Sequence, residues 1–410
     1  MTQPEVSANG VLPDFYSAAA VRLRHWRHIK DVAMRYVMAV GGVSVIIAIL
    51  LIAFYLLYVV VPMFRPARLE QISAYPVPAG TDTGTLYYAL EEQHEIGMRV
   101  TSSGSAVFFR TADGSLVHHK LLTENTLADV TAFATGDPSQ SIFALGLSDG
   151  GVILARHEYE VTYPQDQRVI NPRISYPYGA EPLEVDPFHQ PIRLLAVQSD
   201  EDQATIAALT EDARLLLVNL KETKSFLSDD VETTRTDSEI AIPNRVKHLV
   251  LDVEQRELYA ADDQGFIYFF DTSNKEQPRL IQRVTAVTKG VRITSLQFLS
   301  GGISILVGDS SGQIAQWFPV RDDENNYTLE KIRFFDSQNA PITALAPEFF
   351  RKGFLAADVD GYLGIYHTTA HRTVKLKQVE QTELVRLAVS PRADAVLIET
   401  KAGQSQFWHV

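Results

Sequence analysis

The sequence contains no cysteine, and only three tryptophans are spread over its 410 residues. The absence of cysteine excludes disulfide bonds, thiolate metal sites and a cysteine nucleophile, and it suits an oxidising compartment in which a stray thiol is a liability. Positive charge is also scarce, because 37 Lys and Arg face 50 Asp and Glu and leave a net charge of −13. So acidic a chain lacks the electrostatic footprint of a nucleic-acid-binding protein.

Motifs that carry catalysis are missing as well. The chain has no G-x-S-x-G, P-loop, dinucleotide-binding or H-E-x-x-H pattern. The pairs His118–His119 and His157–Glu158 lie in strand patterns, where we expect surface or edge histidines. Four turn acids raise the question of calcium, but without a twelve-residue ligand loop they indicate turn chemistry: Asp113, Asp149, Asp263 and Asp360. We therefore predict no enzymatic activity, no metal and no cofactor.

One long stretch, residues 37–64, carries no charge. As a continuous helix it would reach about 42 Å, more than the roughly 30 Å hydrocarbon core of a bilayer. A cleaved signal peptide has a shorter apolar part and ends at a small-residue cleavage site, which is absent here. The stretch is therefore predicted to be an uncleaved transmembrane helix, and no comparable run follows between Arg65 and Val410.

Charge on the two sides of this helix predicts its orientation. Residues 1–64 hold five Lys and Arg against three acids, whereas the remainder carries a net charge of about −15. The positive-inside rule then places the N-terminus in the cytoplasm and residues after about 65 outside it. In a Gram-negative bacterium these residues would be periplasmic and the helix would lie in the inner membrane. The segment before the helix mixes cations with an aromatic, which suits anionic lipid headgroups or a partner-binding elbow helix. Its candidate contact residues are Arg22, Arg24, Trp26, Arg27 and Lys30.

Beyond residue 95 a hairpin pattern recurs about seven times. Each copy is an apolar strand, a turn built on Asp, Ser or Gly, and a second apolar or aromatic strand. The copies begin at Ser105, Ser141, Ala204, Arg256, Ile303, Gly353 and Asp394. A further strand precedes most copies, and the turn glycines Gly265, Gly312, Gly361 and Gly403 lie about 42–49 residues apart. A period of two within units excludes a helical solenoid, and a period of this length predicts a seven-bladed, WD40-like β-propeller.

The last copy ends at Val410 without an outer strand. Ring-closed propellers often complete their last blade with an N-terminal strand, which removes an open edge. Candidates for this strand are residues 67–78 (ARLEQISAYPVP) and the TLYYALE run just after them. The predicted organisation is a cytoplasmic basic segment over 1–35, a transmembrane helix over 36–64, a linker with the closing strand over 65–95, and a periplasmic propeller over 96–410.

Three functions fit this organisation. The chain is a subunit of a transport machine whose propeller is an appendage, a stand-alone anchored scaffold that binds envelope proteins, or a propeller enzyme. A convergent pocket of acids and bases would favour the enzyme, and the sequence shows none. More membrane spans would favour the transporter.

The N-terminal region resembles the start of a group of proteobacterial phosphate ABC-transporter permeases, in which a large extracytoplasmic insertion follows the first membrane helix. The resemblance rests on the RHIKD entry at Arg27, the Gly41–Gly42 pair and the FYLLYVVVPMF exit from Phe54. It implies a role in phosphate import beside a partner permease, a cytoplasmic ATPase and a periplasmic phosphate-binding protein. Such permeases continue into several more membrane helices, so we expect this chain to be either the first part of a longer protein or a split or truncated product.

Overall fold

A computed structural model describes residues 18–61, 68–224, 231–243, 245–324, 327–370 and 372–410. The chain divides into two compact units, Met1–Pro66 and Ala67–Val410. The first unit contains a single helix, α1 (Ala18–Val60), of 43 residues. Its last charged residue is Arg35, so the predicted basic segment and the apolar segment form one continuous helix with no break at residue 36. Residues 1–17 and 62–67 of the predicted segments lie outside the described residues.

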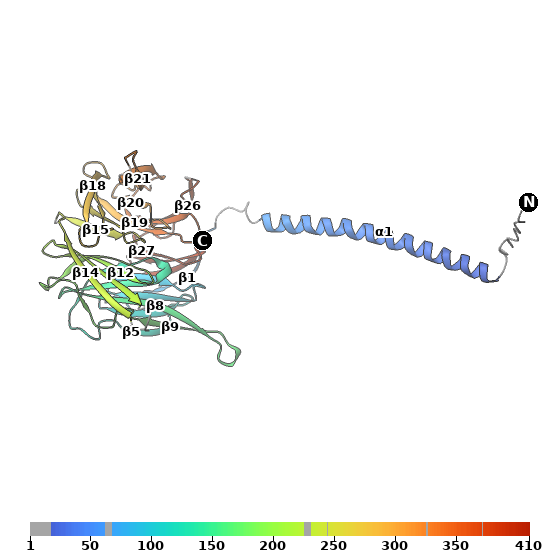
Figure 1. The fold of residues 1–410 in the computed structure, drawn as a ribbon, viewed down its shortest axis with the longest axis horizontal. Helices are drawn as coiled ribbons and strands as arrows, with labels where there is room; N and C mark the ends of the chain where they lie inside the picture. The colour runs from blue at the N-terminus through green and yellow to red at the C-terminus, as the bar shows by residue number, and fades with distance from the viewer. Residues whose placement is uncertain (1–17, 62–67, 225–230, 244, 325–326, 371) are drawn as a thin grey trace, which may run out of the picture. The chain divides into compact units, whose positions relative to one another are not determined.

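The second unit consists of seven antiparallel sheets (Figure 1). The first three are formed by β2 (Thr85–Leu90), β3 (Ile96–Thr101), β4 (Ser105–Arg110) and β5 (Leu116–Leu121); by β6 (Val130–Thr135), β7 (Ile142–Leu147), β8 (Gly151–Thr162), β9 (Val169–Ser175) and β10 (Leu183–Glu184); and by β11 (Ile192–Ser199), β12 (Gln203–Thr210), β13 (Leu215–Lys224) and β14 (Val231–Ile240). Two one-turn 3₁₀ helices, Pro138–Gln140 and Pro164–Asp166, lie in loops of the second sheet.

The remaining four sheets continue in chain order. They are formed by β15 (Val246–Leu251), β16 (Glu257–Asp262), β17 (Phe266–Asp271) and β18 (Arg279–Thr285); by β19 (Ile293–Phe298), β20 (Ile305–Asp309), β21 (Ile314–Arg321) and β22 (Tyr327–Phe334); by β23 (Ile342–Pro347), β24 (Gly353–Asp358), β25 (Tyr362–His367) and β26 (Arg372–Gln378); and by β27 (Leu384–Val389), β28 (Ala395–Thr400), β29 (Gln404–His409) and β1 (Glu70–Pro76). We number these sheets blades 1 to 7 from β2 onward.

The blades close into a ring. Neighbouring blades meet through their first strands: β11 contacts β6 and β15, β23 contacts β19 and β27, and β2 contacts β27. The N-terminal strand β1 pairs antiparallel with β29, from Glu70 opposite His409 to Pro76 opposite Gln404. The first of the two candidate segments therefore closes the ring, and the second forms β2 of blade 1. Because β1 and β2 both belong to blades, the propeller begins before residue 96.

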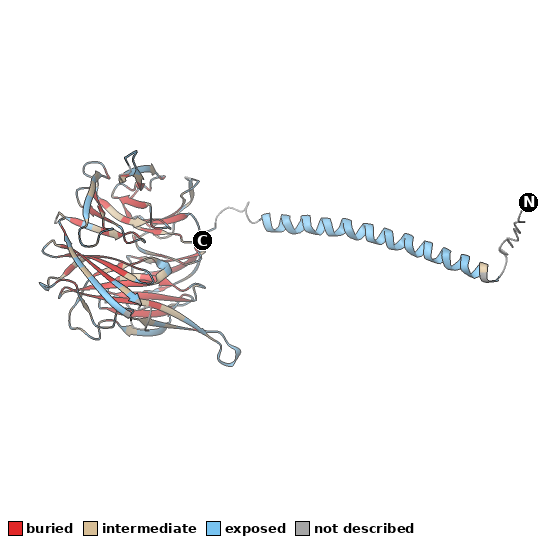
Figure 2. Ribbon diagram, in the orientation of Figure 1, coloured by how far each residue is buried: buried red, intermediate tan, exposed pale blue. Residues whose placement is uncertain are grey.

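Hydrophobic clusters lie between adjacent blades, one at each of the seven junctions. The cluster between blades 7 and 1 illustrates the pattern, because Tyr75 and Phe407 of blade 7 pack with Tyr88 and Phe109 of blade 1. Strands inside each blade are buried on both faces, whereas outer strands are exposed (Figure 2). A single blade cannot bury both faces alone, so the closed ring is the unit that forms the core.

One expected repeat is displaced by a strand. Six of the seven hairpins join the second and third strands of a blade, but the copy beginning at Ser105 joins β4 and β5, the third and fourth strands of blade 1. The equivalent hairpin joins β3 and β4 through a turn ending at Gly104, whose φ is +76°. The error arose because the Asp-Gly at Asp113–Gly114 is a stronger turn signal than the Ser-Ser-Gly that forms the equivalent turn.

Candidate interaction surfaces

The predicted contact residues before the membrane segment all lie on the first half of α1, and all are exposed. They are Arg22, Arg24, Trp26, Arg27 and Lys30. The Lys30 ammonium lies 5.3 Å from the Trp26 ring centroid, a cation–π contact one helical turn apart. Arg24, Arg27 and Arg35 are three and eight residues apart in turn and therefore share one side of the helix. The structure thus presents these residues on the same continuous helix as the apolar segment.

The histidines that the sequence singled out take different positions in the fold. Within the described part of the chain, no group of three or more His, Asp or Glu side chains is arranged to hold a metal ion. His118 and His119 lie on β5, the exposed outer strand of blade 1, in agreement with the sequence-based expectation. His157 differs, because it is 8% exposed and lies between the rings of Phe143 and Tyr159.

The expectation that His157 is a surface or edge histidine is therefore wrong. Burial lowers the pKa of its imidazole to about 4, so the ring is neutral at ordinary pH. Glu158, its neighbour in the sequence, points the other way and pairs with the Arg173 guanidinium at 2.6 Å. Alternation along β8 separates the two side chains to opposite faces of the strand, so they cannot act together.

Turn acids act as backbone caps. The Oδ1 atom of Asp358 accepts the backbone N–H groups of Asp360 at 3.0 Å and Tyr362 at 2.9 Å. Asp262 and Asp309 form the same pair of bonds at the ends of β16 and β20. At the same place in blades 1, 3 and 7 a threonine Oγ1 accepts the N–H group four residues further on: Thr101, Thr210 and Thr400. Turn chemistry therefore occupies these oxygens.

The acids that carry this role differ in part from those named from the sequence. Asp113 and Asp149 each accept the N–H group two residues further on, at 2.9 and 3.1 Å. Asp263 and Asp360, by contrast, lie one and two residues after the capping acids. The signal that would have found the capping acids is their position three residues before a glycine with positive φ, such as Gly361.

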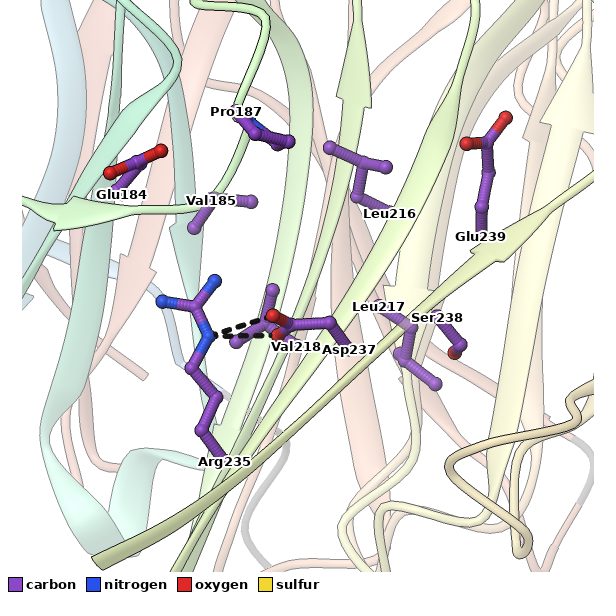
Figure 3. Close-up of a pocket in the computed structure, with 10 residues that line it drawn as sticks. All are labelled: Glu184, Val185, Pro187, Leu216, Leu217, Val218, Arg235, Asp237, Ser238 and Glu239. Atoms are coloured by element: carbon purple, nitrogen blue, oxygen red, sulfur yellow. Dashed lines mark hydrogen bonds and ion pairs between the residues drawn. The ribbon is translucent and has the colours of Figure 1, made fainter.

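A hollow of about 460 Å³ lies between blades 2 and 3 (Figure 3). Its walls come from Glu184 on β10, from β13 and from β14, where Arg235 Nε lies 2.8 and 3.0 Å from the two carboxylate oxygens of Asp237. Because that pair neutralises itself, the carboxylates of Glu184 and Glu239 leave the hollow acidic above a floor that includes Val218. A cationic group is the ligand that this chemistry favours.

A second hollow, of about 560 Å³, lies between blades 3 and 4. Its floor holds the fully buried Gln255, which accepts from Thr205 Oγ1 at 2.7 Å and donates to Asp200 Oδ2 at 3.0 Å. The Lys275 ammonium donates to the carbonyl of Gln255. Burial lowers the pKa of Lys275 to about 8. These hydrogen bonds join Asp200 and Thr205 of blade 3 to Gln255 of blade 4, so they hold the two blades together across the hollow. Neither hollow could be read from the sequence, since each combines residues from two blades.

Comparison with known proteins supports the fold alone. No family model and no curated protein sequence matches this chain. The β-propeller domain of Cps50 (Swd1) from Myceliophteria thermophila is similar in structure, with a TM-score of 0.54 and 12% sequence identity over 84% of this chain and 100% of that chain. A chain in the crystal structure of the Mitotic Checkpoint Complex is similar with a TM-score of 0.53 and 11% identity, over 85% of this chain and 93% of that one.

The protein is therefore a seven-bladed β-propeller of the WD40-like type, with one long apolar helix near its N-terminus. That helix has the length and composition of a membrane span over Ala20–Val60, and none of its apolar window is buried within the protein.

Proposed function

We propose that this chain is a membrane-anchored interaction module in which the propeller binds a protein partner. The observation that carries this proposal is the closed ring of seven blades, a frame that presents loops and turns on rigid sheets. One of the similar structures is a chain of the Mitotic Checkpoint Complex, which supports a protein as the partner. In this proposal α1 is the anchor, because its 25 residues after Arg35 carry no charge.

A finer proposal places the module in a phosphate-type ABC importer of a bacterial inner membrane, with the propeller on the periplasmic side. It is supported by the resemblance of residues 22–64 to the start of such permeases and by the cations that precede the apolar segment. The partners would be a second permease subunit, a cytoplasmic ATPase and a periplasmic phosphate-binding protein. One helix does not form a gated pathway, so this chain would contribute the anchor and the interaction domain.

Topology can be tested directly because the chain has no cysteine. Two single-cysteine variants, Ala18→Cys at the start of α1 and Thr288→Cys in an exposed loop of the propeller, give one label site each. In cells with a permeabilised outer membrane, a membrane-impermeant maleimide should label Thr288→Cys only, and Ala18→Cys should react only after lysis. Labelling of both before lysis, or release of the propeller as a shorter soluble product, would overturn the anchored topology.

The importer assignment needs its own test. The first measurement is the coding sequence past Val410. An open frame that continues into several more apolar spans would support the permease, with the propeller as its insertion. A stop codon there, with no second permease fragment encoded nearby, would rule out the importer proposal and leave the proposal of an anchored interaction module standing. Phosphate uptake by cells in which this gene is deleted provides the functional check, since an importer component is required for uptake whereas an unrelated scaffold is not.

A further inference from the structure

Strand pairing identifies the end of the propeller at which the chain enters. β1 begins at Glu70, opposite His409 at the end of β29. In the turn between β27 and β28, the backbone carbonyl of Asp394 accepts the N–H group of Val410 at 2.9 Å. The chain therefore enters blade 7 beside the turn that joins its first and second strands. Because the blades repeat one strand order around the ring, the equivalent turn of every blade lies at this end, which we call the entry end.

Only a short segment joins the entry end to α1. α1 ends at Val60 and β1 begins at Glu70, so residues 61–69 form the whole connection. Even when fully extended, these nine residues reach about 32 Å at most. If α1 is the anchor proposed above, the covalent chain itself holds the entry end close to a bilayer surface.

Negative charge is concentrated in one part of the entry end. In blades 1 to 4 the turns between the first and second strands together hold nine Asp or Glu residues and one Arg: residues 91–95, 136–141, 200–202 and 252–256. Anionic lipid headgroups repel carboxylates, and carboxylates are better hydrated in water. We therefore expect these four blades to face away from a bilayer.

The turns of blades 5 and 6 have a different charge. Residues 299–304 of blade 5 include no charged side chain. The turn of blade 6, residues 348–352, has the sequence EFFRK, and its Glu348 is buried. The Arg351 guanidinium lies 3.9 Å from Glu348 Oε1, and the Lys352 ammonium has no hydrogen bond or ion pair among the described residues. The exposed charge of the blade 6 turn is therefore positive.

The same two turns carry exposed apolar side chains. Phe350 is 80% exposed, and Phe349 beside it is half-buried. Ser300 Oγ donates to the Phe349 carbonyl at 3.3 Å, which places the turn of blade 5 against the turn of blade 6. Ile303 of the blade 5 turn is 55% exposed. Apolar side chains beside cations are the combination that enters the boundary between lipid headgroups and acyl chains.

Neighbouring acids limit this patch to blade 6 and the inner turn of blade 5. Further out on blade 5, the hairpin between β21 and β22 carries three acids: Asp322, Asp323 and Glu324. The corresponding hairpin of blade 6, residues 368–371, has none in its sequence. In the turn of blade 7, Arg392 pairs with Glu92 at 2.9 Å. Asp394 of that turn pairs with His94 at 3.5 Å. The patch thus lies beside blade 7, the blade through which the chain enters.

We propose that the blade 6 turn, together with Ile303 of blade 5, rests in the surface of the bilayer that holds α1. Phe350 and Ile303 enter the headgroup region, Arg351 and Lys352 meet lipid phosphates, and the acidic turns of blades 1 to 4 face water. The inference rests on the proposed anchor and adds a second, peripheral contact that orients the propeller. A partner protein could cover the same side chains, but the short covalent connection favours lipid because it keeps the bilayer within reach.

The test uses the full chain in nanodiscs of phosphatidylethanolamine and phosphatidylglycerol that include a lipid with a nitroxide on its acyl chain. Because the chain has no cysteine, the single-cysteine variants Ile303→Cys, Asp202→Cys and Thr288→Cys each carry one environment-sensitive fluorophore. Position 303 lies in the proposed contact, position 202 in an acidic turn at the same end, and position 288 in an exposed loop at the opposite end. Quenching by the nitroxide measures contact with the acyl chains.

Three further substitutions, each made in the Ile303→Cys background, identify the residues responsible. Phe350→Ser removes the exposed aromatic ring of the patch. Phe188→Ser is the matched control, since it removes a 68% exposed phenylalanine from the loop between β10 and β11, at the opposite end. Lys352→Glu reverses one charge, and it is also measured in nanodiscs of phosphatidylcholine alone. Thermal melts confirm that each variant folds.

The expected result is quenching at position 303 and none at positions 202 and 288. Phe350→Ser should lower the equilibrium constant for contact about tenfold or more, whereas Phe188→Ser should leave quenching unchanged. Lys352→Glu should reduce quenching more with phosphatidylglycerol present than with phosphatidylcholine alone.

The possible failures are distinguishable. Protein that co-elutes with nanodiscs but shows no quenching at position 303, or equal quenching at all three positions, would overturn the contact and leave the anchor standing. Equal effects of Phe350→Ser and Phe188→Ser would overturn it as well. Failure of the folded full chain to co-elute with nanodiscs would overturn the proposed anchor, and the contact with it.

Discussion

Closure of the ring by β1 can be tested at Tyr75, the one large buried side chain of that strand. Its ring lies edge-on to Phe109 of blade 1, with centroids 6.1 Å apart, and it is 7% exposed. Removing a buried aromatic ring costs about 3–5 kcal/mol. An unfolding entropy of about 2.1 cal/mol/K per residue, taken over the unit Ala67–Val410, gives about 0.7 kcal/mol/K. Tyr75→Ala should therefore lower Tm by about 4–7 °C.

Two companion variants separate the contributions of the ring and the hydroxyl. The Tyr75 hydroxyl is buried without a hydrogen-bond partner among the described residues, and an unsatisfied buried group of this kind costs about 1–3 kcal/mol. Tyr75→Phe should thus leave Tm unchanged or raise it by about 1–4 °C. Ile72→Ala, on the same strand but 48% exposed, should change Tm by less than about 1 °C.

Thermal unfolding of the full chain in detergent, followed by near-ultraviolet circular dichroism, measures all three variants. The fluorescence of Trp408 on β29, which pairs with β1, reports closure locally. If Tyr75→Ala and Ile72→Ala melt within about 1 °C of each other, β1 does not hold the junction of blades 7 and 1 and the reasoning fails.

Three further predictions concern buried groups and turns. Burial depresses the pKa of His157 to about 4. The neutral ring therefore contributes up to about 3 kcal/mol to the free energy of unfolding above pH 6.5, and this contribution is lost as the pH falls towards 4. His157→Phe should remove this part of the pH dependence of stability, as measured by denaturant titrations at several pH values. Gly312→Ala places a Cβ 2.1 Å from a backbone carbonyl and should cost more than about 3 kcal/mol, whereas Gly290→Ala, with similar φ and open space, should cost about 1 kcal/mol; similar midpoints in urea would contradict this difference. Asp358→Ala should cost about 1–3 kcal/mol by freeing two N–H groups, and Asp358→Asn clearly less; equal losses would show that the cap is unimportant.

The sequence was sufficient for the architecture because repetition multiplies a weak local signal. A single hairpin with a glycine turn is compatible with many folds, but about seven copies at similar spacing are compatible with only a few repeat architectures. The long uncharged stretch was equally clear, since periodicity and charge alone identify it. Closure by an N-terminal strand also followed from the sequence, because the last copy lacked an outer strand and an open edge is a liability.

Side-chain roles within strands were harder to predict. The burial of His157 depends on which face of β8 packs against blade 1. The sequence around His157 does not indicate which face that is, although the folded protein places its ring between Phe143 and Tyr159. The displaced copy in blade 1 shows the same limit, because turn chemistry identifies a hairpin but not its place within a blade. Asp262, Asp309 and Asp358 were recognisable only once the glycine that follows each was known to adopt positive φ.

The sequence by itself therefore determined the class of fold, the apolar helix and the order of blades, since these depend on local periodicity, charge and turn residues. Tertiary structure alone decided which residues meet. Strands β11 and β15 are separated by three other strands in the chain and become neighbours only because the innermost strands of adjacent blades pack together. Strands β2 and β27, from opposite ends of the propeller sequence, meet where β1 closes the ring. The physical reason is that ring closure joins distant segments, whereas the residue pattern of a strand indicates only whether each of its faces is buried and not which strand covers it.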